Sequence, residues 1–358
     1  MDGKVIFSTA QKLSAQRFSA KRLAVKNLAA ENLLSQPAID YSVAPQQLKK
    51  RAFPYWRRLQ NPARIYHRIG NLEVRLAASK KDVKKAQRVR YKVFYKEMSA
   101  IPDMKTKMKR RDIDAYDKIC DHLLVLDHSA SSRKSPFKRR TKVVGTYRIL
   151  SEEKARANGG FYTQSEYDLA PLLKRKGHNH KFLELGRSCV LKPFRTKRSV
   201  EMLWHGLWAY IQEQEADVMI GCASFEGTDP KQHALALSFL HHHARAPKDW
   251  RVKAHDHLSQ DMNMMAKEDI DMKKALKALP PLIKGYLRLG AYIGDGAVVD
   301  HQFGTTDILI IMPVAAIDSK YIAHFSTAHQ ALSAKPHLSS AYQSKTGEFH
   351  PVHKQELH

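Results

Sequence analysis

The sequence predicts an α/β protein in which helices cover one mixed β-sheet. Segments typical of strands alternate with segments of helical spacing between about residues 61 and 330, and no Pro- or Gly-rich linker divides this range. No apolar run reaches the ~20 residues that a membrane-spanning helix needs. The best run, 308–317, is about half that length and predicts a buried strand.

The expected elements are strands and helices in mixed order along the chain. Ser79 with Asp82 predicts an N-cap before a helix that extends to about residue 94. Ser199 is expected to cap a longer helix, whose apolar residues are spaced three and four apart. Another helix is expected at 233–243, and a last one begins at Pro281 and ends at Gly290. Residues 129–141 predict a loop, and strands are expected at 72–77, 122–126, 142–150, 182–191, 218–222, 297–300 and 307–315.

This pattern divides the chain into three regions. Residues 61–330 form the folded domain. Residues 1–60 predict a basic, loosely structured arm, because their apolar residues do not gather on one helical face and no secretory signal is present. Residues 331–358 predict a C-terminal tail with little periodicity.

The charge balance predicts anionic partners. Lys and Arg total 61 and Asp and Glu total 35, a formal net charge of +26. Such a field favours nucleic acid, an anionic bilayer surface or an acidic protein. The three cysteines lie far apart, so a disulfide framework is not expected and a reducing, cytoplasmic setting is favoured. The His-rich segments 241–243 and 255–257 lack metal-ligand spacing, so we expect no metal site.

Two clusters of polar residues are candidates for substrate chemistry. Four aspartates at 112, 114, 117 and 121 follow the segment 90–94, and they could hold a cationic diamino acid or balance the basic run 105–111. In 184–190, strict alternation points Glu184 and Arg187 to opposite faces. A β-bulge at Gly186 would bring both to one face and free a backbone N–H for an acyl carbonyl, while the carboxylate accepts an amine proton. The alternative is a buried Glu–Arg pair.

Further candidates lie later in the chain. The basic turn before the long helix predicts a site for a pantetheine phosphate at the helix N-terminus, or else a solvated turn; its residues are Arg195, Lys197, Arg198 and Ser199. Tyr286 could protonate a leaving thiolate, or it packs in the core. Asp300 and Asp307 could line a substrate pocket or belong to turns.

Taken in order, these motifs resemble the L-ornithine Nα-acyltransferase family of bacterial ornithine-lipid biosynthesis. That family is similar to acyl-homoserine-lactone synthases and has the GNAT acetyltransferase fold. The resemblance covers about residues 64 to 325. The matching motifs are Arg90-Tyr-Lys-Val-Phe94, Asp114-x-x-Asp117, Asp121-His-Leu-Leu-Val125, Gly145-Thr-Tyr-Arg148, Glu184-Leu-Gly-Arg-Ser-Cys-Val190, Gly221-Cys-Ala-Ser-Phe225, the run from Leu279 to Gly290, Asp300 and Asp307.

The resemblance implies a GNAT-like mixed sheet and transfer of a (3-hydroxy)fatty acyl group from acyl carrier protein to the α-amine of L-ornithine. The product would be lyso-ornithine lipid. No bound cofactor is implied, since the acyl carrier protein thioester is a co-substrate, and the enzyme would be cytoplasmic with peripheral contact at an anionic inner membrane face. Catalytic roles would fall to Glu184, His122 and Arg187, and substrate binding to Arg90, Phe94, Asp114, Asp117, Arg148, Asp300 and Asp307.

Three other functions stay open. One is a signal synthase that uses S-adenosylmethionine, from which the chain departs in length and in its C-terminal block. A second is an acyltransferase for another amino acid. The third is nucleic-acid binding, which the basic and aromatic cluster at 49–58 favours but no recognition motif supports.

Overall fold

The structure is a computed structural model. It describes residues 63–98, 100–129, 131–132, 135–139, 141–319 and 321–322. The predicted arm at 1–60 and the predicted tail at 331–358 lie outside the described residues. Within these ranges, none of the helices combines the length and the apolar character that crossing a bilayer requires.

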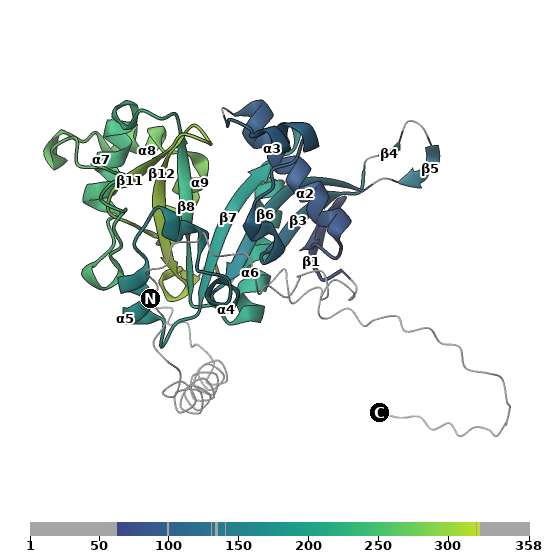
Figure 1. The fold of residues 1–358 in the computed structure, drawn as a ribbon, viewed down its shortest axis with the longest axis horizontal. Coiled ribbons are helices and arrows are strands. Elements are labelled where there is room, and N and C mark those ends of the chain that lie inside the picture. Colours follow the sequence, from purple (N-terminus) through teal and green to yellow (C-terminus); the bar gives the residue numbers. More distant parts are fainter. Residues whose placement is uncertain are drawn as a thin grey trace, which may run out of the picture. The chain divides into compact units, whose positions relative to one another are not determined.

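The described chain forms one ten-stranded sheet covered by helices, as the alternating pattern predicts (Figure 1). The strand order is β1-β2-β3-β6-β7-β8-β12-β11-β9, with β10 paired to β12. The strands are β1 Ile65–Ile69, β2 Leu72–Leu76, β3 Asp121–Asp127, β6 Lys142–Ser151, β7 Phe182–Val190, β8 Val218–Glu226, β9 Ser259–Gln260, β10 Tyr292–Ile293, β11 Ala297–Asp300 and β12 Thr305–Pro313. The helices are α2 Lys80–Lys92, α3 Met104–Lys109, α4 Glu152–Arg156, α5 Ala170–Lys176, α6 Lys197–Gln214, α7 Ala234–His243, α8 Met272–Ala278 and α9 Pro281–Arg288.

All the strands expected from the sequence are present, and two local predictions are wrong. The region 129–141 was expected to be a loop, but it contains a two-stranded ladder of β4 Ser131–Ser132 and β5 Ser135–Arg139. Helix α6 begins earlier than expected, because Thr196 rather than Ser199 is its N-cap and accepts a hydrogen bond from the Ser199 N–H. The short elements β1, α3, α4, α5, β9, α8 and β10 carry no periodicity long enough to predict them.

Alternation along β3 builds a core on both faces of the sheet. Leu123 and Val125 belong to the larger core, which α6 covers, whereas Leu124 and Leu126 belong to a second core beneath α2. These four side chains are at most 2% exposed. Successive strand residues point to opposite faces, so a fully apolar strand needs a helix on each side. The sheet is therefore a middle layer between helices (Figure 1).

The sheet opens between β7 and β8. These strands are the only parallel pair of named strands within the described ranges, and they pair only from Phe182–Glu184 to Val218–Ile220, although each is nine residues long. Beyond that point β7 pairs with β6 alone, and β8 pairs with β12 alone. Gly221 lies where they separate, and a Cβ there would be 2.2 Å from the carbonyl oxygen of Leu185.

The bulge expected in β7 is present, one residue later than predicted. Gly186 stays in register opposite Arg148, but the register then shifts, so that Cys189 lies opposite Thr146. Arg187 occupies the extra position with a φ of 52°. A bulge lets consecutive residues share one face of the sheet. Glu184 and Arg187 thus both line the same cavity, as proposed from the sequence.

We expect Gly221→Ala to destabilise the protein by about 3 kcal/mol, the upper end of overpacking, since the new Cβ meets rigid backbone. The matched control is Gly285→Ala in α9, where nothing lies within 4 Å of the added carbon. That control should be neutral or stabilising by up to about 1 kcal/mol. Chemical denaturation measures both, and equal stability of the two variants would contradict the close approach.

Candidate active site

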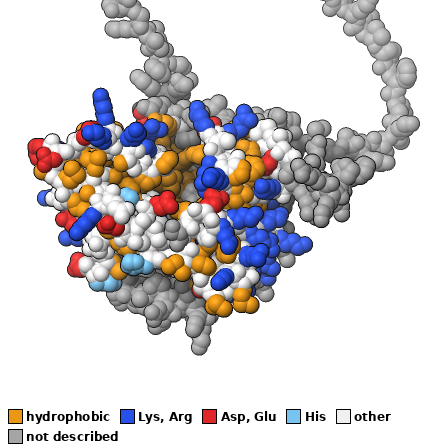
Figure 2. Space-filling view, turned by 90° about the horizontal axis from the view of Figure 1, so that it is seen from above, with side chains coloured by type: hydrophobic (Ala, Val, Ile, Leu, Met, Phe, Trp, Pro, Cys, Tyr) orange, Lys and Arg blue, Asp and Glu red, His pale blue; other side chains and the backbone are white. Residues whose placement is uncertain are grey.

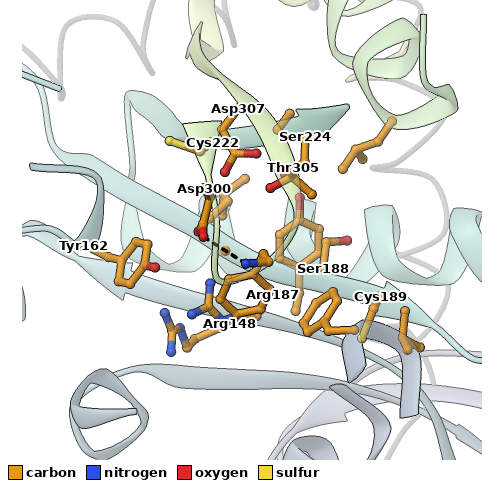
Figure 3. Close-up of a pocket in the computed structure, with 18 of the residues that line it drawn as sticks. Arg148, Tyr162, Arg187, Ser188, Cys189, Cys222, Ser224, Asp300, Thr305 and Asp307 are labelled. Atoms are coloured by element: carbon orange, nitrogen blue, oxygen red, sulfur yellow. Dashed lines mark hydrogen bonds between the residues drawn. The ribbon is translucent and has the colours of Figure 1, made fainter. Parts of the chain in front are cut away.

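A cavity of about 440 Å³ occupies the opening between β7 and β8 (Figure 3). Seen from above, apolar side chains gather along the middle of the molecule, and Lys and Arg side chains concentrate on the side of α2 and α3 (Figure 2). Site residues predicted from the sequence that line the cavity are Phe94, Arg148, Glu184, Arg187, Arg195, Tyr286, Asp300 and Asp307. Those outside its lining are Arg90, Asp114, Asp117, His122, Lys197, Arg198 and Ser199.

Beneath the cavity lies a buried network of arginines and aspartates. Arg90 is completely buried, with its Nε 2.7 Å from Asp112 and its Nη2 2.7 Å from Asp117. Arg148 pairs with Asp114, and Arg187 lies 3.5 Å from both Asp112 and Asp114. Burial is the largest effect on the pKa of Asp117 and acts to raise it, but Arg90, Arg148 and His122 together lower the pKa below its usual value. Asp117 therefore stays ionised at neutral pH.

This arrangement shows which groups neutralise the four aspartates. The aspartates are balanced by arginines of α2, β6 and β7 rather than by the basic run 105–111. The fourth, Asp121, pairs with Lys154 and accepts a hydrogen bond from Tyr210. Asp114 and Asp117 pair with arginines, and neither carboxylate lines the cavity.

Glu184 is anchored to backbone amides. Its two carboxylate oxygens accept hydrogen bonds from the N–H of Tyr162 at 2.9 Å and of Thr163 at 2.6 Å. Burial raises the pKa of Glu184, and these amide hydrogen bonds act in the opposite direction. The side chain thus fixes the turn η5, Tyr162–Ser165, against the cavity wall. Glu184 therefore does not form the buried Glu–Arg pair that was the alternative interpretation. Its carboxylate is not free either, because both oxygens accept backbone hydrogen bonds.

His122 lies on β3 and is completely buried. Its Nε2 is 3.1 Å from the carbonyl oxygen of Asp117, and burial lowers its pKa to about 4. The imidazole is therefore neutral at pH 7. His122 does not line the cavity.

An acidic wall forms the opposite side of the cavity. It consists of Glu166, Asp300 and Asp307, each of which has one carboxylate oxygen within 4.8 Å of one from each of the other two. Burial raises the pKa of Glu166 to about 7 and that of Asp307 to about 6. The sequence predicted both aspartates but missed Glu166, which lies in an irregular segment without a motif. Figure 3 shows Asp300 and Asp307 beside Cys222, whose thiol donates to Glu166 Oε2 at 3.1 Å.

Arg187 faces the acidic wall from β7 (Figure 3). Its guanidinium carbon lies 4.4 Å from the ring centre of Phe303 and 4.9 Å from that of Tyr162. Phe94 packs edge-on against Phe303, with ring centres 5.7 Å apart. A guanidinium held between aromatic rings keeps its charge and a fixed plane. The cavity thus has a cationic side and an anionic side.

Tyr286 lines the cavity from α9 and is also a packing residue. Its hydroxyl shares a hydrogen bond with that of Tyr147 on β6, and its ring meets Trp204 edge-on at 5.7 Å. Burial raises its pKa well above the usual range. The hydroxyl therefore stays protonated and is able to donate.

The basic turn before α6 is divided between the cavity and the surface. Arg195 lines the cavity, donates to the Val190 carbonyl at 2.9 Å and pairs with Glu97 at 2.5 Å. Lys197 is 92% exposed, and Arg198 is also exposed. Ser199 is buried, and its N–H is taken by Thr196 at 3.3 Å. Of these four residues of the basic turn, only Arg195 is both charged and part of the cavity lining.

Known proteins share this sequence and fold. A family model described as an acetyltransferase (GNAT) domain matches residues 89–205. The chain is 50% identical over 261 residues to an L-ornithine Nα-acyltransferase of Agrobacterium fabrum, covering 73% of this chain and 87% of the relative. It is 51% identical to the enzyme of that name from Brucella abortus, covering 73% and 91%. The chain belongs to the L-ornithine Nα-acyltransferase family.

This acyltransferase also has a distant likeness among solved structures. An N-acyl amino acid synthase from uncultured soil microbes is 10% identical, over 68% of this chain and 91% of that chain, with a TM-score of 0.39. The GNAT match ends at residue 205, so it includes the arginine–aspartate network and Glu166. The residues that β8, β11 and β12 add to the cavity lie beyond it. Two of the three acidic-wall residues, Asp300 and Asp307, therefore lie beyond the GNAT match.

We expect Arg90→Met to destabilise this acyltransferase by about 3–5 kcal/mol, because two buried carboxylates lose their cation. Lys181→Met is the control. It removes an exposed pair with Glu215, 2.9 Å apart, and should change stability by less than about 1 kcal/mol. Urea unfolding compares the two, and a similarly small loss in Arg90→Met would show that the network is not a stabilising centre.

Proposed function

We propose that this acyltransferase moves a fatty acyl group from the thioester of acyl carrier protein to the α-amine of L-ornithine. Its substrates are an acyl donor and an amino-acid acceptor, in keeping with its family. One observation carries the finer proposal. The cavity places a guanidinium opposite three carboxyl groups, beside a strand edge that has lost its partner.

The charge arrangement suits a zwitterionic acceptor with additional positive charge. Arg187 offers a planar, two-pronged donor for the carboxylate of an amino acid. The acidic wall of Glu166, Asp300 and Asp307 offers acceptors for ammonium groups. Ornithine carries one carboxylate and two amines, so it complements both sides of the cavity. This assignment moves ammonium binding from Asp114 and Asp117 to the acidic wall.

The donor is assigned to the free edge of β7. The strand has no partner in β8 beyond Glu184, and a pantetheine arm contains amides that pair with such an edge as an added strand would. Arg195, with Lys197 and Arg198 nearby in sequence, is proposed to meet its phosphate. The apolar part of the cavity, which includes Met98 and Leu282, is proposed to hold the acyl chain.

Acyl carrier protein is the proposed partner because the chain carries +26 and Lys and Arg side chains concentrate on the side of α2 and α3 (Figure 2). Complementary charge speeds the encounter with an acidic protein. The product would be a single-chain lyso-ornithine lipid. We also propose peripheral contact with an anionic membrane, since the same basic face would attract its headgroups.

The reaction proposed is direct attack of the acceptor amine on the thioester, without an acyl-enzyme. Backbone N–H groups at the β7 bulge near Gly186 are assigned to the developing oxyanion. Tyr286, whose hydroxyl is protonated, is assigned to the leaving thiolate. Glu184 contributes by holding Tyr162 and Thr163 in place, and Tyr162 in turn packs on Arg187. The residue that takes the amine proton is considered below.

Product identification tests the function directly. Purified protein is incubated with 3-hydroxyacyl-acyl carrier protein, a panel of amino acids and S-adenosylmethionine, and products are read by mass spectrometry. We expect N-acyl-ornithine together with free carrier-protein thiol. If the product is another acyl-amino acid, the acceptor is that amino acid and not ornithine. If the product is a lactone, the enzyme is a signal synthase. If no pair of donor and acceptor gives a product, the proposed function, acyl transfer from acyl carrier protein, is wrong.

Arg187→Gly tests the acceptor carboxylate site. Glycine tolerates the positive φ of 52°, so the bulge is kept while the guanidinium is lost. We expect KM for ornithine to rise roughly 10- to 100-fold, the value of one charge-assisted contact, with a smaller change in kcat. Steady-state kinetics at saturating acyl donor measure this. An unchanged KM for ornithine would mean that Arg187 does not bind the carboxylate of ornithine.

A further inference from the structure

Glu166 and Asp307 are two buried carboxyl groups that face the same cavity. Glu166 is 9% exposed and Asp307 is 7% exposed, and both line the space between β7 and β8 (Figure 3). Asp307 Oδ1 lacks a partner at ordinary hydrogen-bond geometry among the described residues, although the Ser224 and Thr305 hydroxyls lie near enough to act on the pKa of Asp307. Buried polar atoms nearly always find partners. Acceptors directed into a cavity therefore indicate a ligand that brings N–H donors.

The surroundings of Glu166 favour its protonated form. Its closest charged neighbours are carboxyl groups, and two such groups close together do not both ionise easily. Burial raises the pKa of Glu166 to about 7, and Asp307 is the next largest cause. The titratable groups that face Glu166 are Cys222 on β8, Asp307 on β12, Asp300 on β11, Arg187 on β7, and Tyr162 and Tyr167 on its own segment.

The position of Glu166 along the opening matches the place of reaction. Its partner Cys222 lies two residues after Ile220, the last β8 residue paired with β7. Across the opening at this level are Gly186 and the bulge at Arg187, which line the same cavity. A thioester on the β7 edge would thus lie beside Glu166. Glu184, in contrast, already accepts two backbone N–H groups.

We propose that Glu166 and Asp307 form the subsite for the acceptor amine, and that Glu166 accepts the proton that this amine loses. The assignment rests on the proposed acyl transfer. The ammonium gives one proton to Glu166, and the freed lone pair forms a bond to the thioester carbonyl carbon. As the carbon–sulfur bond breaks, the thiolate leaves with its electron pair and takes the proton of the Tyr286 hydroxyl. The second amine proton then restores that hydroxyl. Glu166 then returns its proton to water.

This assignment predicts a specific pH dependence. A base acts in its ionised form, so kcat/KM should rise as the pH increases through about 7, where Glu166 ionises. The two carboxyl groups are close, so the measured value belongs to the pair. Asp307→Asn removes a like charge and should shift this acidic limb to lower pH. A carboxyl that served only to pack the core would leave the pH profile of catalysis unmoved.

The test compares Glu166→Gln with Asp168→Asn. Glutamine keeps the size and one oxygen acceptor for the Cys222 thiol, while Asp168 is exposed and outside the cavity lining, and Asn replaces its capping oxygen. We expect Glu166→Gln to lower kcat/KM roughly 10²- to 10⁴-fold and to abolish the acidic limb. Asp168→Asn should match the wild type in both rate and pH profile. Thermal unfolding verifies that both variants are folded.

The outcomes separate this inference from the function on which it rests. Wild-type N-acyl-ornithine formation is established first by mass, and its absence would defeat the function itself. If the wild type is active and folded Glu166→Gln keeps its rate and its acidic limb, Glu166 is not the base and the function stands. If Glu166→Gln does not fold, the shift in Asp307→Asn decides, and an unmoved limb there overturns the subsite.

Discussion

The separation of β7 from β8 is the constraint on which the rest of the site depends. The strands pair only as far as Glu184 and Ile220, after which each is held by its outer neighbour, β6 or β12. Because both are anchored on their outer sides, the gap is not closed by further pairing, and a strand edge remains free inside the folded domain. Such an edge can pair with an extended ligand through backbone hydrogen bonds. The cavity beside it is of a size usual for small-molecule sites.

Carboxyl groups around this opening have pKa values shifted in opposite directions because their neighbours differ. Arg90 and Arg148 lower the pKa of Asp117 and Asp114 against the effect of burial. Glu166 and Asp307 are equally buried, but each has another carboxyl group as a close neighbour, and their pKa values are raised. The fold thus separates permanent charges, which position Arg187, from carboxyl groups that exchange protons near neutral pH.

Periodicity and motifs in the sequence predicted the central strands, the long helix and the family, because those signals are local. They did not separate accessible from buried charge, so Arg90 and Asp117 were expected to meet substrate although they form a closed pair. Glu166 was missed because it lies in an irregular segment, far in sequence from Asp307. Its environment exists only once β8 and β12 bring the two carboxyl groups together.

The bulge shows which part of Arg187 the site requires. An arginine at a φ of 52° is in the left-handed region, where a side chain costs about 1 kcal/mol or more and glycine costs none. Gly186, directly before it, remains in the regular ladder with open space at its Cβ position. The backbone alone would favour glycine at 187. At this strained position the guanidinium packs between Phe303 and Tyr162 and faces the acidic wall. The strain is therefore offset by contacts of the side chain and is not required by the turn itself.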